Sequence, residues 1–128
     1  MTQEQKQLLL KDLCARLPYG VICKLSVKGA DVSITEKLDL GGLDSFIFDT
    51  MDVLPYLRPM SSMTEEEKKE FQACHCVYEL HPDFQPIMCN LANELNMFNW
   101  LNAHRFDYRG LIPMGLAIEA PEGMYKKD

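Results

Sequence analysis

The sequence has no cluster of lysines and arginines and no long apolar run. Its 13 basic and 19 acidic residues give a formal net charge of -6. Affinity for nucleic acid comes largely from neutralising phosphates, so this balance argues against a nucleic-acid partner. No stretch approaches the roughly 18 apolar residues of a membrane-spanning helix, and the polar start lacks the features of a signal peptide. We therefore predict a cytoplasmic protein with no membrane contact.

Recognisable cofactor and catalytic motifs are also lacking. Gly41-Gly42 has no G-x-G-x-x-G or G-K-[ST] context, which favours a turn over a phosphate-binding loop. Ser61 and Ser62 have no G-x-S-x-G context, so they are expected to be loop residues. The five cysteines are an odd number, and reduced, packed thiols explain them better than a disulfide framework does. We predict no cofactor.

The length and hydrophobic content suit one globular domain spanning residues 1–128. A chain of this size with 47% hydrophobic residues can build a single core without a metal or a disulfide. Thr2 and Gln5 form a capping-box pattern, and apolar residues follow at helical spacing until Pro18. The chain is therefore expected to start with a helix.

Alternating apolar and polar residues then predict a β-hairpin over about 21–40. The alternation begins at Val21, turns at Gly29-Ala30-Asp31 and resumes at Val32 and Ile34. The short apolar run at 46–48 is a candidate third strand. Residues 52–59 contain two prolines, so we expect an ordered connector there and not a helix or a central strand. The predicted fold class is α+β, with a small antiparallel sheet followed by a helical C-terminal half.

The helical half begins with a second capping-box pattern at Thr64 and Glu67. A long helix is predicted over 86–104, packed on two sides, with Glu94 exposed at its edge. Its expected core stripe consists of Phe84, Ile87, Met88, Leu91, Ala92, Leu95 and Phe98. After it, Asp107 is a predicted N-cap for a helical turn over 108–114. A short strand over 116–118 and a loose tail from residue 121 complete the expected fold.

Three blocks of the sequence resemble a known group. They are L-P-Y-G-V at 17–21, Y-L-R-P-M-S-S-M-T-E-E-E at 56–67, and the stretch from W-L-N-A-H-R-F-D-Y-R-G to A-P-E-G-M-Y at 100–125. The blocks are similar to short uncharacterised proteins encoded in gut Bacteroidetes and in their phages or mobile elements. The resemblance implies a genomic setting and carries over neither an activity nor a site.

Two sets of residues are candidates for chemistry. His104, Asp107 and Arg109 could form an acid–base group at the end of the long helix. The structural interpretation, which we favour, is a histidine in the last turn, a capping aspartate and an arginine in a salt bridge. Cys74, Cys76 and His81, with Cys89 downstream, have ligand types suited to zinc, but two cysteines two residues apart on a helix point about 200° apart. Packing is again the favoured interpretation.

A surface near Trp100, His104 and Tyr108 is the predicted binding site. Eight methionines are many for this length, and methionine suits adaptable interfaces as well as cores. We expect a non-enzymatic interaction protein or accessory factor that binds a protein partner or a second copy of itself. The alternative is a small metal-binding protein or enzyme that uses His104, Asp107 and Arg109 or the cysteine cluster.

Overall fold

A computed structural model of the protein describes residues 1–73 and 86–125, and it describes side chains in these ranges except at 86–93. The sheet has the order β2-β1-β3-β4 and is antiparallel except for the parallel pair β3–β4. The α+β class is confirmed, and the predicted antiparallel sheet becomes mixed at its last strand. The elements in chain order are α1 (Gln3–Arg16), η1 (Leu17–Tyr19), β1 (Ile22–Val27), β2 (Ser33–Lys37), α2 (Leu40–Ile47), β3 (Met51–Leu57), η2 (Met60–Ser62), α3 (Glu65–Ala73), α5 (Pro86–Ala103) and β4 (Ile118–Glu119).

The N-terminal helix forms as its local signals predict. The Thr2 hydroxyl accepts a hydrogen bond from the Gln5 backbone, and the Gln5 side chain accepts one from the Thr2 backbone. The two bonds satisfy donors that a helix start leaves open. Leu9 and Leu13 are fully buried against the sheet, and the chain passes into η1 at Pro18.

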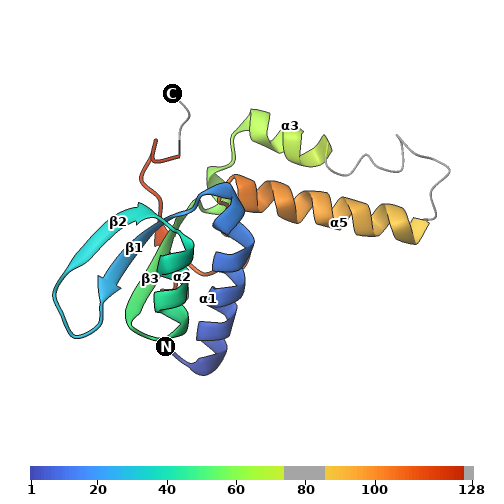
Figure 1. The fold of residues 1–128 in the computed structure, drawn as a ribbon. Helices are drawn as coiled ribbons and strands as arrows, with labels where there is room; N and C mark the ends of the chain where they lie inside the picture. The colour runs from blue at the N-terminus through green and yellow to red at the C-terminus, as the bar shows by residue number, and fades with distance from the viewer. Residues whose placement is uncertain (74–85, 126–128) are drawn as a thin grey trace.

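Helices α1 and α2 cover one face of the sheet, and the core lies between them and it (Figure 1). Val21, Cys23 and Leu25 are buried at alternate positions, whereas the residues between them are partly exposed. This confirms the alternation that predicted β1, because successive side chains of a strand point to opposite faces.

The predicted turn at Gly41-Gly42 and the candidate strand at 46–48 are wrong, because residues 41, 42, 46 and 47 belong to α2 and Phe48 is its C-cap. The Asp39 carboxylate accepts from the Gly42 backbone N–H and caps the helix. A Cβ at Gly42 would lie 3.2 Å from Leu38 Cδ1 and 3.6 Å from Leu25 Cδ2. Glycine at this position therefore leaves room for the Leu38 side chain against the start of α2.

The predicted connector at 52–59 is also wrong in part, because β3 includes the fully buried Pro55 as an inner strand. In a strand, alternate residues direct their N–H and C=O groups to the same side. The Leu57 carbonyl accepts from Ala120 on the β4 side, so the Pro55 nitrogen also faces that side. Strand β4 pairs only with Tyr56 and Leu57. Proline is tolerated because no ladder bond is required there.

Strand β2 departs from the expected burial. All five of its residues are exposed, and Val32 before it is exposed as well. Ile34 pairs with Leu25 and so shares the core-side face of the sheet, yet 49% of Ile34 is exposed. The strand lies at the sheet edge, beyond the cover that α1 and α2 provide.

Helices α3 and α5 extend from the body of the protein (Figure 1). The second capping box is confirmed, with Thr64 and Glu67 bonded in both directions. The core stripe predicted for the long helix is wrong where its side chains are described, because Leu95 is 61% exposed and Phe98 is also exposed. Glu94 is exposed, as predicted. The other stripe residues lie outside the described side chains.

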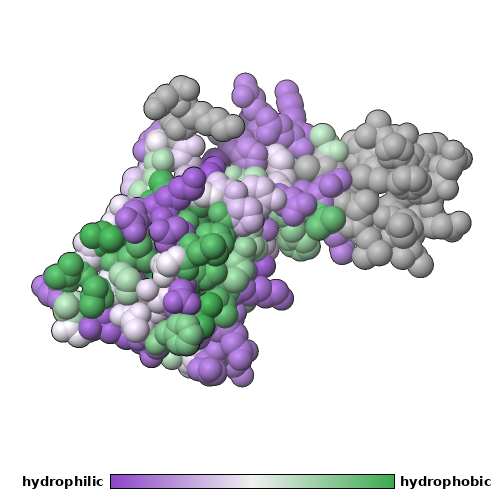
Figure 2. Space-filling view, viewed as in Figure 1, coloured by the Kyte–Doolittle hydropathy of each residue, from purple (hydrophilic) through white to green (hydrophobic). Residues whose placement is uncertain are grey.

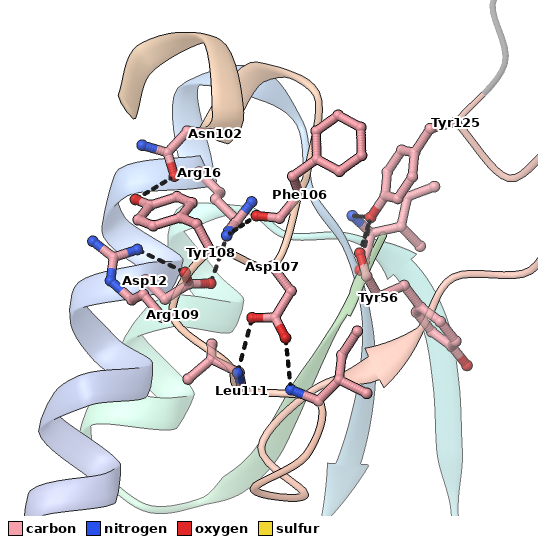
Figure 3. A network of polar contacts seen from close by, with 12 residues as sticks. Asp12, Arg16, Tyr56, Asn102, Phe106, Asp107, Tyr108, Arg109, Leu111 and Tyr125 are labelled. Atoms are coloured by element: carbon pink, nitrogen blue, oxygen red, sulfur yellow. Dashed lines mark hydrogen bonds and ion pairs between the residues drawn. The ribbon is translucent and has the colours of Figure 1, made fainter. Parts of the chain in front are cut away.

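The tail is held in place as far as Tyr125, contrary to the predicted loose end. The Tyr125 hydroxyl accepts from the Ile22 backbone N–H at 2.9 Å and donates to the Tyr56 carbonyl at 2.6 Å (Figure 3). Burial raises the pKa of this phenol to about 12, so the hydroxyl keeps its proton. Tyr125 thereby links the C-terminal segment to β1 and β3.

Tyr125→Phe should lower the free energy of unfolding by about 1–2 kcal/mol, because it leaves the Ile22 N–H and the Tyr56 carbonyl without this partner. Urea unfolding followed by circular dichroism measures the change. Tyr19→Phe, at an exposed tyrosine, is the control and should change stability by less than about 0.5 kcal/mol. Equal losses in the two variants would contradict the linking role of the Tyr125 hydroxyl.

Candidate functional site

The candidate site is built where α5 ends. The Phe106 N–H donates to the Leu101 carbonyl at 3.0 Å, and the Arg105 N–H donates to the Asn102 carbonyl at 3.2 Å. These two bonds define a Schellman motif, whose residue in the left-handed conformation is usually glycine. Here that residue is Arg105, with φ of 60°. A non-glycine residue in this conformation costs about 1 kcal/mol or more, so the Arg105 side chain has a structural or functional use.

A buried ion network joins the segment after α5 to the N-terminal helix (Figure 3). The Asp12 carboxylate accepts from Arg16 Nε at 2.8 Å and from Arg109 Nη1 at 2.7 Å. Arg16 also donates to the Phe106 carbonyl at 2.7 Å. Asp12 and Arg16 are fully buried. The sequence showed no sign of this pair, because both residues fall within a helix that reads as an ordinary amphipathic one.

Tyr108 and Asp107 serve this same junction. The Tyr108 ring lies between the guanidinium groups of Arg16 and Arg109, which are 5.3 Å and 4.6 Å from its centre. The Tyr108 hydroxyl donates to Asn102 Oδ1 at 2.9 Å. The Asp107 carboxylate accepts from the two backbone N–H groups of residues 111 and 112. The predicted N-cap role of Asp107 for a helical turn over 108–114 is wrong, because residues 108–114 are not helical. Asp107 instead holds the start of the non-helical turn that begins at residue 111.

Four side chains stack on the side of Phe106 away from its contact with Arg16. They are Trp100, His104, Phe106 itself and Arg58. The Trp100 ring lies 4.1 Å from the His104 ring and 5.6 Å from the Phe106 ring. The Arg58 guanidinium lies over the Phe106 ring, 4.2 Å from its centre. Both Arg58 Nη atoms donate to the Glu67 carboxylate at 2.7 Å. The stack thus connects α5 to the start of α3.

The His104 imidazole faces two carboxylates of α3. Its Nδ1 is 3.7 Å from Glu67 Oε2, and its Nε2 is 3.9 Å from Glu70 Oε2. Burial lowers the pKa of His104 below its ordinary value, although both carboxylates oppose the shift. The ring is therefore neutral at neutral pH. Hydrogen bonds from Arg58 lower the pKa of Glu67 to about 2.

The structure gives His104, Asp107 and Arg109 separate partners: the α3 carboxylates, the backbone of a turn, and Asp12. Of the predicted binding residues, Trp100 and His104 stack on each other, while Tyr108 belongs to the Asp12 network. The metal candidates Cys74, Cys76 and His81 lie outside the described residues. Within 1–73 and 86–125, no group of three or more His, Cys, Asp or Glu side chains is placed to hold a metal ion.

A groove of about 1180 Å³ opens beside the stack. Four stretches of the chain form its walls: Tyr19, the 58–67 stretch, the end of α5 and residues 119–125. A second hollow of about 540 Å³ shares Tyr19, Arg105, Met124 and Tyr125 with it. The Arg105 guanidinium stacks 4.7 Å from the Tyr125 ring between the two hollows and donates to the Tyr19 carbonyl. Sequence reasoning missed Arg58, Arg105 and Tyr125, which only the fold brings together.

No family model matches the chain, and neither curated proteins nor solved structures include a significant match. None of the helices in the described part of the chain has the length and apolar character needed to cross a membrane.

Asp12→Asn should lower the free energy of unfolding by about 3 kcal/mol or more, because it leaves the buried Arg16 cation without its charge partner. Arg109→Gln should have a smaller effect, since 17% of the Arg109 side chain is exposed to water. Urea unfolding measures both, with Asp44→Asn at an exposed aspartate as control. A loss for Asp12→Asn no greater than that of the control would show that the network does not stabilise the fold.

Glu67→Gln should make the free energy of unfolding depend less on pH in the acid range. The depressed pKa means that the Glu67 contribution, about 1 kcal/mol, is complete above a pH of about 4.5 and disappears as the pH falls toward about 2. The stability difference between the original protein and Glu67→Gln should therefore shrink from about pH 6 to about pH 3. Urea unfolding at a series of pH values tests this, with Glu65→Gln of the same helix as control. A constant difference over that range would contradict the assignment.

Proposed function

We propose that this protein is a non-enzymatic interaction protein whose groove beside His104 and Arg105 binds an extended segment of a protein partner. The groove itself is the observation on which the proposal rests. Its volume of about 1180 Å³ exceeds the roughly 300–1,000 Å³ typical of small-molecule pockets. An elongated chain segment therefore suits it better than a compact metabolite does.

The contacts of the acid–base candidates favour binding over catalysis. Asp107 accepts two backbone hydrogen bonds, and Arg109 donates to the buried Asp12. A general base must be free to reach a substrate proton, whereas these groups hold the fold together. The His104 ring stacks on Trp100 and faces Glu67 and Glu70, and these contacts hold it against α3.

Charge on the groove walls suggests the chemistry of the segment. Arg105 Nε is buried and has no hydrogen-bond partner among the described residues. The Arg105 side chain also lines the groove, so its charge would attract a carbonyl or carboxylate oxygen of a bound chain. Glu119 and Glu122 are exposed groove residues, and they favour a basic side chain on the same segment. We therefore propose a partner with an extended, mainly basic segment.

The cellular setting remains part of the proposal. The resemblance of the blocks at 56–67 and 100–125 to proteins of gut Bacteroidetes and their mobile elements favours a cytoplasmic accessory factor. The acidic net charge of -6 is compatible with a basic protein partner.

Selection from a random peptide library on the purified full-length protein tests the groove. Ser62 lines it, whereas the neighbouring exposed Ser61 does not. The selected peptides should bind Ser61→Trp as tightly as the original protein and bind Ser62→Trp at least about tenfold more weakly, a loss of about 1.4 kcal/mol. A library that yields no binders, or peptides that bind Ser62→Trp undiminished, would rule the groove out.

Arg105→Gly provides a second arm. Glycine relieves the left-handed backbone at this position, so the Schellman motif should remain intact while the guanidinium is removed. Peptide affinity should fall. The midpoint of urea unfolding should fall no further than the loss of the Arg105 contact with the Tyr19 carbonyl accounts for. Unchanged peptide affinity would exclude Arg105 from the binding site.

A further inference from the structure

Strand β2 offers an open sheet edge on the side of the molecule away from the groove-forming helices α3 and α5 (Figure 1). All five residues of this strand are exposed. A strand edge carries backbone donors and acceptors that pair readily with another strand. The C-terminal half of this strand, Thr35 to Lys37, lines the smaller hollow, which shares four residues with the groove. Pairing through the edge and binding in the groove therefore concern neighbouring surfaces.

The hydrogen bonds to β1 show which backbone groups of β2 face outward. Val27 N–H donates to the Val32 carbonyl, and Leu38 N–H donates to the Val21 carbonyl. Even-numbered residues of β2 therefore face β1, since alternate residues direct their N–H and C=O groups to the same side. Ser33, Thr35 and Lys37 direct theirs away from the sheet.

Val32 and Ile34 place exposed apolar side chains at this edge, on the same face of the sheet. Ile34 shares the core-side face with Leu25, its partner in β1. Helix α2 packs on that face; Leu40 at its start is 73% exposed, and Phe48, the residue after it, is 71% exposed. Figure 2 shows hydrophobic surface over the β1–β2 hairpin and α2. An edge with an apolar border of this kind is typical of an interaction site.

We propose that two copies of the chain pair antiparallel through their β2 edges, with Ile34 on the twofold axis. In such a pair, an outward-facing residue of one copy must lie opposite an outward-facing residue of the other. Because the outward-facing residues are all odd-numbered, the twofold axis must pass through a single residue and not between two residues. A centre at Ile34 places Ile34 opposite Ile34 of the second copy. The outward groups of Ser33 and Thr35 then exchange hydrogen bonds with those of Thr35 and Ser33 across the axis.

The alternative registers match less well. The Ile34-centred register also places Asp31 opposite Lys37 of the second copy, a favourable charge pair. This register also sets Val32 against Glu36 on each side of the axis. A centre at Ser33 would set Val32 against Ile34 but would leave Lys37 opposite Gly29, which lies in the turn outside the strand. A centre at Thr35 would set Ile34 against Glu36 and Asp31 against Asp39, and a centre at Glu36 would set two carboxylates against each other. The Ile34-centred register thus pairs all five residues of β2 and adds a charge pair, which favours a second copy as the occupant and makes the interface isologous.

Sedimentation of the full chain at a series of concentrations tests the pairing. The weight-average mass should rise from 14.7 kDa toward twice that value as concentration increases. Thr35→Pro removes one outward N–H and no bond to β1, so it should stay monomeric with an unchanged far-ultraviolet spectrum. Thr35→Val, which keeps the N–H, should still dimerise. A monomer at every concentration of the original protein, or a dimer of Thr35→Pro, would overturn the proposal.

Cysteine cross-linking tests the register without depending on the proline variant. In the Ile34-centred pair the two Ile34 Cα atoms lie about 4.5 Å apart, within reach of a disulfide. The two Glu36 residues share the same face but lie about 13 Å apart along the strands, beyond that reach. Mild oxidation should therefore join two copies of Ile34→Cys through residue 34 and should not join Glu36→Cys through residue 36, as read by mass spectrometry of linked peptides. The reverse pattern would disprove this interface.

Discussion

The burial of a single carboxylate, Asp12, governs how the two ends of the chain come together. Two cations meet it: Arg16 from the next turn of α1, and Arg109 from 97 positions further along the chain. Removing such charges from water costs several kcal/mol per ion, which only close pairs with good geometry offset. The segment after α5 must therefore lie against α1 for either element to be stable in this arrangement.

Phe106 connects this network to the candidate groove. Its carbonyl accepts from Arg16, while its ring stacks with Trp100 and Arg58 on the other side. Arg105 precedes it in a left-handed conformation that turns the chain sharply at the end of α5. The strain of that turn persists because the surrounding contacts determine the backbone on both sides. As a result, the Arg105 side chain is held beside the groove.

Local signals predicted the elements whose ends have specific chemistry. The capping boxes at Thr2 and Thr64 are present as predicted, and so is the alternation at Val21, Cys23 and Leu25. The errors fall where packing overrides local preference. A glycine pair became the first turn of α2 because Asp39 caps the helix there and Gly42 packs closely against Leu38. A proline entered an inner strand because its nitrogen faces the unpaired side.

The candidate site shows the same division. The sequence by itself determined where α5 ends and that Trp100 and His104 lie near each other at that end, since these are relations within a few residues. Only the tertiary structure decided that Asp12 and Arg16 are buried and paired, and that Arg58, Arg105 and Tyr125 meet around one groove. It also left β2 uncovered at the sheet edge. The physical reason is that burial and charge pairing depend on which distant segments exclude water from a side chain, and no local spacing encodes that.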